Sequence, residues 1–357
     1  MTAPRLEIRL DRIQHNARSL VDRLGARGIA VTGVTKATLG SPAVACELLA
    51  GGVAAIGESR IENIEALRRA GIDAPMTLIR APMLSQVDRV VEHADVSLNT
   101  ELAVIEALSE SAAARGRDHG VVLMVELGDL REGILPADLE AVVGATRKLA
   151  GITLRGIGTN LACQSGVAPD LTNMAELSGL ARSLESTFAI ELEVVSGGNS
   201  ANLDWALSGS EVGRVNDLRL GESILLGCEP LQRRPIDGLR TDAFTLVAEV
   251  IESKVKPSQA WGTINQTAFG DQAPPPDRGD TARGILAVGR QDVDPLGLTA
   301  PAGITILGAS SDHLVVDAGD ALLAVGSEMR FQLGYSALLA AMTSPFVTKE
   351  YPTSDQA

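Results

Sequence analysis

The sequence predicts an α/β protein that begins with a closed parallel (β/α)8 TIM barrel and ends with a smaller, mostly β domain. Eight short apolar runs recur between residues 29 and 227, and segments with helical spacing separate them. After residue 232 the pattern changes to alternating strands and turn formers. A chain of 357 residues is long enough for both domains. We therefore expect a barrel over 1–232 and a β domain over 233–357.

The barrel prediction depends on how each run is connected to the next one. Segments such as "RIENIEALRRAG" and "PADLEAVVGATRKLAG" have helical spacing and close on glycine, a common helix end. Repeated strand-helix units indicate a parallel sheet, either a closed barrel or an open doubly wound sheet, and eight units favour the barrel. The expected strands are 29–36, 53–59, 75–82, 94–100, 120–128, 152–162, 190–199 and 216–227.

The last part of the chain has the sequence pattern of a β domain. "TDAFTLVAEVIESKVKP", "ARGILAVGRQDV", "AGITILGASSDHLVVDA" and "ALLAVGSEMRFQL" are apolar or alternating segments with turn formers between them. The Pro-rich segment 270–280 is expected to be a turn region, residues 334–342 a short helix, and the tail 351–357 frayed.

Composition limits the classes of partner. A formal net charge of −14 argues against nucleic acid or an anionic membrane surface. The first residues lack the apolar core of a signal peptide, and no run of apolar residues is long enough to span a membrane. The 3 cysteines form neither a CxxC nor a zinc pattern, so we expect a cytoplasmic protein with no disulfides and no metal.

Three expected strands end in residues that suggest a reactive site. Lys36 ends the first strand, where barrel enzymes place their chemistry; it is either an ion-pair partner or a reactive amine. Strand seven ends in the glycine-rich "SGGNS", whose backbone N–H groups and Ser200 hydroxyl suit a phosphate. Arg219 and a glycine turn end strand eight. Alone, "SGGNS" is a weak motif, but the three together suggest pyridoxal 5'-phosphate (PLP).

Longer phrases carry a resemblance to a known family. The opening "PRLEIRLDRIQHNARSLVDRLGARGIAVTGVTKA", "GESRIENIEALRRAG" and "RLGESILLG" resemble the fold type III PLP enzymes, the alanine racemase superfamily. "VTGVTK", "GESRIENI", "GRQDVD" and "GASSDH" resemble its ornithine racemase (alanine/ornithine racemase) branch. The resemblance implies an isomerase that interconverts L- and D-amino acids by two-base Cα proton transfer through an external aldimine. Ornithine is the favoured substrate, with lysine or alanine as alternatives.

The resemblance also assigns roles to residues of the barrel. Lys36 would bind the cofactor and act as one base, and Arg219 would face the pyridine nitrogen. Because arginine does not release its proton, the ring nitrogen would stay unprotonated, a weaker electron sink that suits racemization. Arg131, in "VELGDLREGI", would anchor the substrate, and Asn160 stands where relatives carry a ring-stacking histidine. The phosphate would be held by Asn199, Ser200, Gly221 and Glu222.

The second base is the main departure from the family. Alanine racemase uses a tyrosine from the partner's β domain, but "WGTINQTAFGDQ" has Phe269 there. The resemblance would place Ser311 at the substrate carboxylate, and strand alternation would put His313 on the same face, so His313 is the candidate base. Tyr335 is the second choice. Asp292 and Asp312 are candidates for the distal ammonium of a diamino acid. The implied assembly is a head-to-tail homodimer whose active sites are shared between subunits.

Two other functions stay open at this point. Type III decarboxylases of basic amino acids share the fold but usually need a cysteine in the β domain, and no cysteine follows Cys228. Non-catalytic PLP-binding or PLP-homeostasis proteins resemble the "SGGNSANLDWALSGSEVGRV" segment, but they are lone barrels without a second domain.

Overall fold

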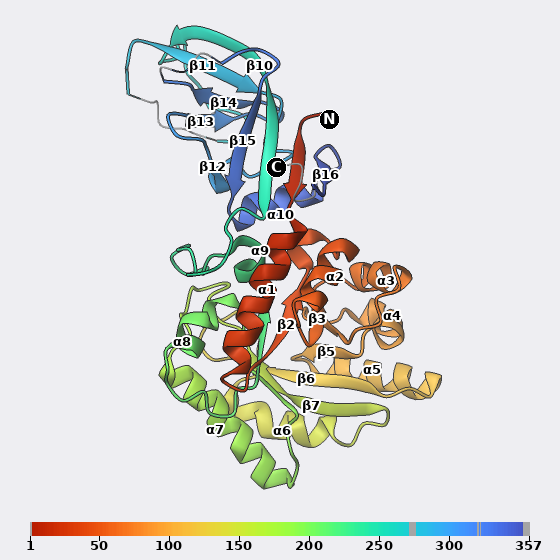
Figure 1. Ribbon diagram of the computed structural model, residues 1–357. Helices are drawn as coiled ribbons and strands as arrows, with labels where there is room; N and C mark the ends of the chain where they lie inside the picture. The colour runs from red at the N-terminus through yellow and green to blue at the C-terminus, as the bar shows by residue number, and fades with distance from the viewer. Residues whose placement is uncertain (1, 271–275, 320, 322, 353–357) are drawn as a thin grey trace. The chain divides into compact units, whose positions relative to one another are not determined.

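The computed structural model describes residues 2–270, 276–319, 321 and 323–352 (Figure 1). The chain divides into two compact units, Leu10–Thr241 and the combination of Met1–Arg9 with Asp242–Ala357. We call them the barrel unit and the β unit. Part of the expected turn region 270–280 and most of the expected frayed tail lie outside the described residues.

The predicted closed parallel barrel is confirmed in the described part of the chain. Strands β2 to β9 pair in sequence order, and β9 pairs with β2 to close the sheet, with Thr32 opposite Arg219. Side chains of Leu98, Val122 and Met124 form a small apolar core in the strands. The strands are β2 (Ala30–Val34), β3 (Ala55–Glu58), β4 (Met76–Leu78), β5 (Val96–Asn99), β6 (His119–Val125), β7 (Ile152–Thr159), β8 (Val194–Ser196) and β9 (Asp217–Leu220).

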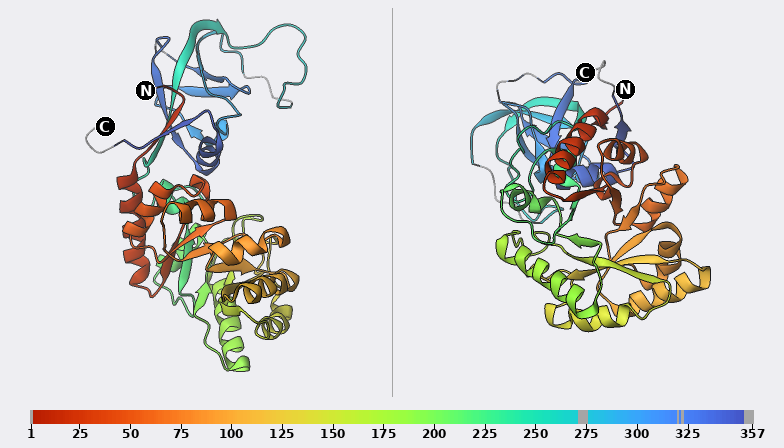
Figure 2. Two further views of the ribbon diagram at one scale, coloured as in Figure 1. Left: turned by 90° about the vertical axis from the view of Figure 1, so that its right-hand side faces the viewer. Right: turned by 60° about the horizontal axis from the view of Figure 1, so that its bottom comes forward.

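Helices lie around the outside of the barrel strands (Figures 1 and 2). The first helix buries Ile13, Ala17, Leu20 and Leu24, the spacing of one apolar helix face. The fifth ends at Gly116, whose φ of 59° is the left-handed region that glycine tolerates. The helices are α1 (Leu10–Gly25), α2 (Pro42–Ala50), α3 (Ile61–Arg69), α4 (Val87–His93), α5 (Leu102–Arg115), α6 (Pro136–Thr146), α7 (Leu171–Phe188), α8 (Leu203–Leu207) and α9 (Glu222–Leu226), with 3-10 turns η1 (Lys36–Thr38), η2 (Leu84–Gln86) and η3 (Ser200–Asn202).

Strand ends differ from the expected ranges. The run 29–36 stops being a strand at Val34, because Lys36 already begins η1. The run 216–227 contains both β9 and the short helix α9, with Gly221 between them. Apolar periodicity cannot separate a buried strand from a buried helix that follows it directly.

The expected mostly β C-terminal part is confirmed: in the described residues its sheet is antiparallel apart from the parallel pair of β1 and β16, and it carries the short helix α10. Its path is β12-β15-β10-β11-β14-β13, and β1 pairs with both β10 and β16. The N-terminal strand thus lies beside strands from the end of the chain (Figure 1). The elements are β1 (Arg5–Ile8), β10 (Phe244–Pro257), β11 (Asp280–Leu286), η4 (Pro295–Gly297), β12 (Leu298–Thr299), β13 (Thr305–Ala309), β14 (Leu314–Asp317), β15 (Glu328–Leu333), α10 (Tyr335–Thr343) and β16 (Thr348–Glu350).

Among the described residues, every helix is too short or too polar to traverse a lipid bilayer.

Candidate active site

Lys36 follows β2 in a turn that its neighbour Thr35 holds in place. The Thr35 hydroxyl donates to Oε2 of Glu58 at 2.9 Å, and the Thr35 carbonyl accepts the Thr38 N–H at 2.9 Å. Thr35 is fully buried, whereas Lys36 is half-buried. The turn therefore fixes the position of the lysine backbone at the carboxyl end of the strand.

The start of α9 lies close to the end of β2. A Cβ placed on Gly221 would lie 3.2 Å from Cβ of Val34, closer than an ordinary van der Waals contact. Burial raises the pKa of the neighbouring Glu222, while the charges of Arg233 and Lys36 oppose that shift. Lys36 and Glu222 are therefore near enough to interact electrostatically, although they are far apart in sequence.

The glycine-rich loop after β8 leads to Ser200. Gly198 has φ 138°, and a Cβ there would lie 2.2 Å from Oδ1 of Asn202. That oxygen accepts the Asn199 N–H at 3.1 Å, which completes the first turn of η3. The Ser200 hydroxyl is 3.0 Å from the Ser223 hydroxyl and accepts the Ser223 N–H at 3.2 Å. The first turns of η3 and α9 therefore meet, and the N–H groups of such turns suit an anion.

Arg219 is buried inside the barrel, with 5% of its surface exposed. Its Nη1 donates to the Ser196 hydroxyl at 2.5 Å and its Nη2 donates to the Thr159 carbonyl at 2.8 Å. Burial lowers the pKa of Arg219, and the nearby charge of Asp217 opposes this. The guanidinium is therefore held between β7, β8 and β9 at their carboxyl ends.

Asn160 connects Arg219 to the glycine-rich loop. Its Oδ1 accepts from Nδ2 of Asn199 at 3.2 Å and lies 3.5 Å from Nη2 of Arg219. Its Nδ2 is buried and has no hydrogen-bond partner among the described residues. A buried donor without a partner is costly unless a bound group supplies an acceptor.

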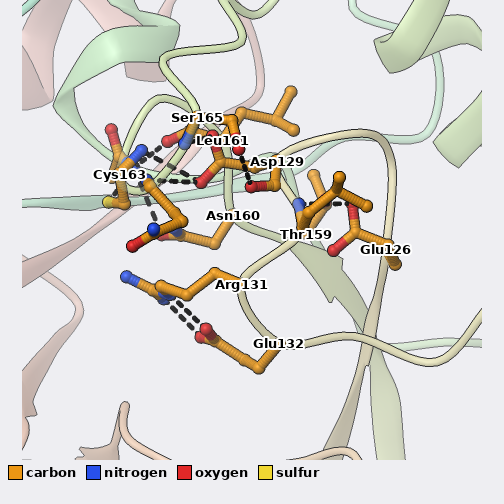
Figure 3. Close-up of polar contacts among 12 residues, drawn as sticks. Glu126, Asp129, Arg131, Glu132, Thr159, Asn160, Leu161, Cys163 and Ser165 are labelled. Carbon is orange, nitrogen blue, oxygen red and sulfur yellow. Dashed lines mark hydrogen bonds and ion pairs between the residues drawn. The ribbon is translucent and has the colours of Figure 1, made fainter.

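Arg131 lies on the loop after β6, where Figure 3 shows its guanidinium paired with Glu132. The buried Asp129 carboxylate accepts N–H groups of Cys163 at 3.1 Å, Gln164 at 2.9 Å and Ser165 at 3.1 Å. These bonds, also visible in Figure 3, tie the loop after β6 to the loop after β7. The positive charge of Arg131 helps to lower the pKa of Arg219.

The structure thus gathers the predicted barrel residues at one end of the barrel. Short contacts or electrostatic interactions link Lys36 with Glu222, Ser200 with the first turn of α9, and Asn160 with both Asn199 and Arg219. An amine, hydroxyls, backbone N–H groups and a guanidinium at one edge are a donor set for an anionic aldehyde cofactor.

Sequence reasoning missed three acidic residues of this region: Glu58, Asp129 and Asp217. The Glu58 carboxyl is fully buried and accepts from Thr35 and from the Ser59 N–H at 2.7 Å; its burial raises its pKa. A charged residue at the end of the apolar run "VAAIGES" was a usable signal for Glu58. Asp129 and Asp217 act through partners distant in sequence, which no local pattern reveals.

One expectation for the β unit is wrong. Ser311 and His313 do not share a strand face, because β13 ends at Ala309 and β14 begins at Leu314, and the residues between them form a turn. Instead, Nδ1 of His313 lies 2.7 Å from Oδ1 of Asp312. A tight turn reverses the chain and so breaks the alternation on which the expectation depended.

Asp292 and Tyr335 are the remaining candidates of the β unit, and Asp292 has hydrogen-bond partners there. Asp292 is buried and accepts the Gly289 N–H at 3.1 Å and the Ser344 hydroxyl at 3.0 Å. The guanidinium of Arg290 stacks 4.7 Å from the ring centroid of Phe269, and the backbone N–H of Arg290 donates to the Ser310 carbonyl at 2.9 Å. Tyr335 begins α10.

Comparisons with known proteins agree over nearly the whole chain. The family description "Alanine racemase, N-terminal domain" matches residues 8–230. The lysine racemase of Thermotoga maritima is 40% identical over 357 residues, covering 99% of this chain and 100% of that protein. The ornithine racemase of Acetoanaerobium sticklandii is 37% identical over 351 residues, covering 97% and 99%. The alanine racemase of D-cycloserine-producing Streptomyces lavendulae has the same fold, with a TM-score of 0.76, 21% identity and coverage of 99% and 98%.

Proposed function

Because the chain belongs to the alanine racemase N-terminal domain family, we propose that it is a PLP-dependent racemase of a basic amino acid. Ornithine, which the sequence phrases favour, and lysine are the candidate substrates, since the relatives named for them are 37% and 40% identical. Alanine is a weaker candidate, because the alanine racemase with the same fold is only 21% identical. The enzyme is an isomerase, and we assign it to the cytoplasm, where its free cysteines would stay reduced.

The observation that carries the cofactor assignment is the donor set at the carboxyl ends of the barrel strands. Lys36 offers an amine to the aldehyde. Ser200 and the N–H groups at Gly221 and Glu222 offer donors to the phosphate. The unpartnered Nδ2 of Asn160 offers a buried donor to a polar atom of the cofactor. The residues present therefore fit PLP.

Bound PLP supplies an electron sink that acidifies the substrate Cα proton. Lys36 then accepts or donates that proton on one face of the substrate. Because arginine does not release its proton, Arg219 can donate a hydrogen bond to the ring nitrogen but does not transfer a proton to it. Arg131 is the candidate cation for the substrate carboxylate.

The opposite face of the substrate needs a second proton carrier, for which we propose His313. Its Nδ1 contact with Asp312 leaves Nε2 as the atom that would transfer the proton. Phe269 cannot ionise, and the aromatic side chain of Tyr335 is the alternative. We infer that His313 acts on the active site of a second subunit in a head-to-tail homodimer, with Ser311 at the substrate carboxylate and Asp312 or Asp292 near its distal ammonium.

Two alternatives are less well supported. A lone-barrel PLP-homeostasis protein would not need the β unit, yet the lysine racemase covers 99% of this chain. A type III decarboxylase would usually need a cysteine in the β unit, and none follows Cys228 in the sequence.

The decisive experiment incubates the enzyme with PLP and L-ornithine or L-lysine in deuterium oxide. Loss of optical rotation with deuterium at Cα supports racemization, whereas carbon dioxide release supports decarboxylation, and cofactor binding without turnover supports the homeostasis protein. Lys36→Ala should abolish both racemization and covalent PLP attachment, and the exposed Lys148→Ala should change neither. Covalent PLP attachment that persists in Lys36→Ala would contradict the proposal.

Mixing two inactive variants tests the shared site. If Lys36 and His313 act in one site from different subunits, a mixture of Lys36→Ala and His313→Asn chains forms heterodimers with one intact site. After subunit exchange at equal concentrations, such a mixture should recover about a quarter of the wild-type rate. If both residues act from the same chain, the mixture stays inactive.

A further inference from the structure

A buried guanidinium needs a compensating charge, and the barrel supplies one next to Arg219. Asp217 precedes Arg219 by two residues on β9, so strand alternation puts both side chains on the same face of the sheet. The Asp217 carboxylate is half-buried, and its charge raises the pKa of Arg219 against the effect of burial. Without such a partner, an arginine with 5% exposure would carry a large desolvation cost.

Ser196 on β8 connects the two charged groups. Its hydroxyl donates to Oδ2 of Asp217 at 2.5 Å and accepts from Nη1 of Arg219 at 2.5 Å. A hydroxyl can do both at once, since it has one proton and two lone pairs. The position of the carboxylate therefore fixes the orientation of the guanidinium through one buried side chain, that of Ser196.

The other oxygen of Asp217 makes a bond that does not lead to Arg219. The Thr32 hydroxyl, from β2, donates to Oδ1 of Asp217 at 2.8 Å. Both hydroxyls thus bond the same carboxylate, but only Ser196 also contacts the arginine. The far side of the guanidinium is fixed by the Thr159 carbonyl at 2.8 Å from Nη2.

We propose that Asp217 and Ser196 are positioning residues that hold the Arg219 guanidinium, charged and in one orientation, at the carboxyl end of the barrel. Asp217 provides the opposite charge and Ser196 the directional link. This inference rests on the proposed role of Arg219 beside the cofactor ring, and it adds the residues that set the angle and charge of that contact. An arginine free to turn would present a different N–H, or none, to the ring nitrogen.

The test uses Ser196→Ala and Asp217→Asn, with Thr32→Val as the matched control. Each enzyme is loaded with PLP labelled with ¹⁵N in the ring, and the ¹⁵N resonance of the bound cofactor is measured with kcat and KM. We expect Ser196→Ala and Asp217→Asn to shift the resonance and to lower kcat about 10-fold or more with little change in KM. Thr32→Val should leave the resonance in place, and Ser196→Thr, which keeps the hydroxyl, should restore it.

A second measurement needs no cofactor. The urea unfolding of the cofactor-free protein is compared for Asp217→Asn, Arg219→Met and the double variant. If Asp217 compensates the guanidinium charge, Asp217→Asn lowers the unfolding midpoint less in the Arg219→Met background than in the wild type. Additive effects would overturn the pairing.

The outcomes separate this inference from the proposed function. A wild type that does not racemize any tested amino acid defeats the proposed function, whatever the urea results are. A racemase whose ¹⁵N resonance is the same in Ser196→Ala, Asp217→Asn and wild type retains the proposed function and overturns the positioning role. Equal resonance shifts in Thr32→Val and Ser196→Ala would also overturn it.

Discussion

Replacing His119 by asparagine should make the barrel unit less sensitive to acid. His119 begins β6, has 1% of its surface exposed, and lies with Nε2 2.8 Å from the Ser97 hydroxyl. Burial lowers the pKa of His119 to about 4 from an ordinary value of 6.5. The native state therefore keeps this ring neutral at pH values where the unfolded chain protonates it.

The sign and size of the effect follow from linkage. Between pH 6.5 and about 4 the unfolded state binds more protons than the native state, so stability falls as the pH falls through this window. Each pKa unit corresponds to 1.36 kcal/mol, so the whole window amounts to about 3 kcal/mol. Roughly 2 kcal/mol of this should be lost between about pH 7 and pH 4.5.

Urea unfolding of the cofactor-free protein at these two pH values measures the loss. His119→Asn keeps a polar partner near Ser97 but cannot protonate, so its stability should fall about 2 kcal/mol less than that of the wild type. The same substitution at the exposed His15 is the matched control and should behave like the wild type. An equal acid loss in His119→Asn and the wild type would refute the reasoning.

Three further substitutions test other parts of the structure. Gly156→Ala would place a Cβ 1.7 Å from a β8 carbonyl oxygen and should cost about 3 kcal/mol or more of stability, measured as a lower Tm. The control Gly179→Ala, where α7 leaves open space for a Cβ, should raise the Tm slightly. Equal Tm shifts in the two variants would contradict the close approach of β7 and β8. Asp129→Asn should speed amide hydrogen exchange in residues 163–165 at least about 10-fold, because an amide cannot accept all three N–H groups, and unchanged exchange would rule out the clamp. Burial raises the pKa of Glu58, so ionisation of this carboxyl costs stability as the pH rises. In urea unfolding, the stability of Glu58→Gln relative to the wild type should therefore increase from acid to alkaline pH. A stability difference between the two proteins that stays constant with pH would argue against a buried ionising group.

Local patterns were sufficient to predict the barrel. Apolar runs alternate with amphipathic segments, and the burial that produces this pattern acts over a few residues at a time. Lys36 was visible for the same reason, as a charged residue at the end of an apolar run. The end of β2 at Val34 was not visible, because the turn depends on a bond from Thr35 to Glu58 on another strand.

The contacts that complete the site could not be predicted from sequence. Thr32 and Asp217 meet across the closing seam of the barrel, 185 residues apart, and Ser196 is 23 residues from Arg219. Such pairs have no periodicity to detect. The turn at Ser310–His313 was missed because "GASSDHL" lies between two strands and its sequence pattern is also that of one continuous strand.

The position of β1 has a consequence for how the protein is made on the ribosome. Arg5 and its neighbours pair with Val247 and with Thr348, so β1 leaves the exit tunnel before its partners, which are translated only after the whole barrel unit. During this interval its edge is open to other nascent chains or to chaperones. A bulky fusion or a deletion at the N-terminus should therefore harm the sheet at the other end of the sequence more than the barrel that follows it.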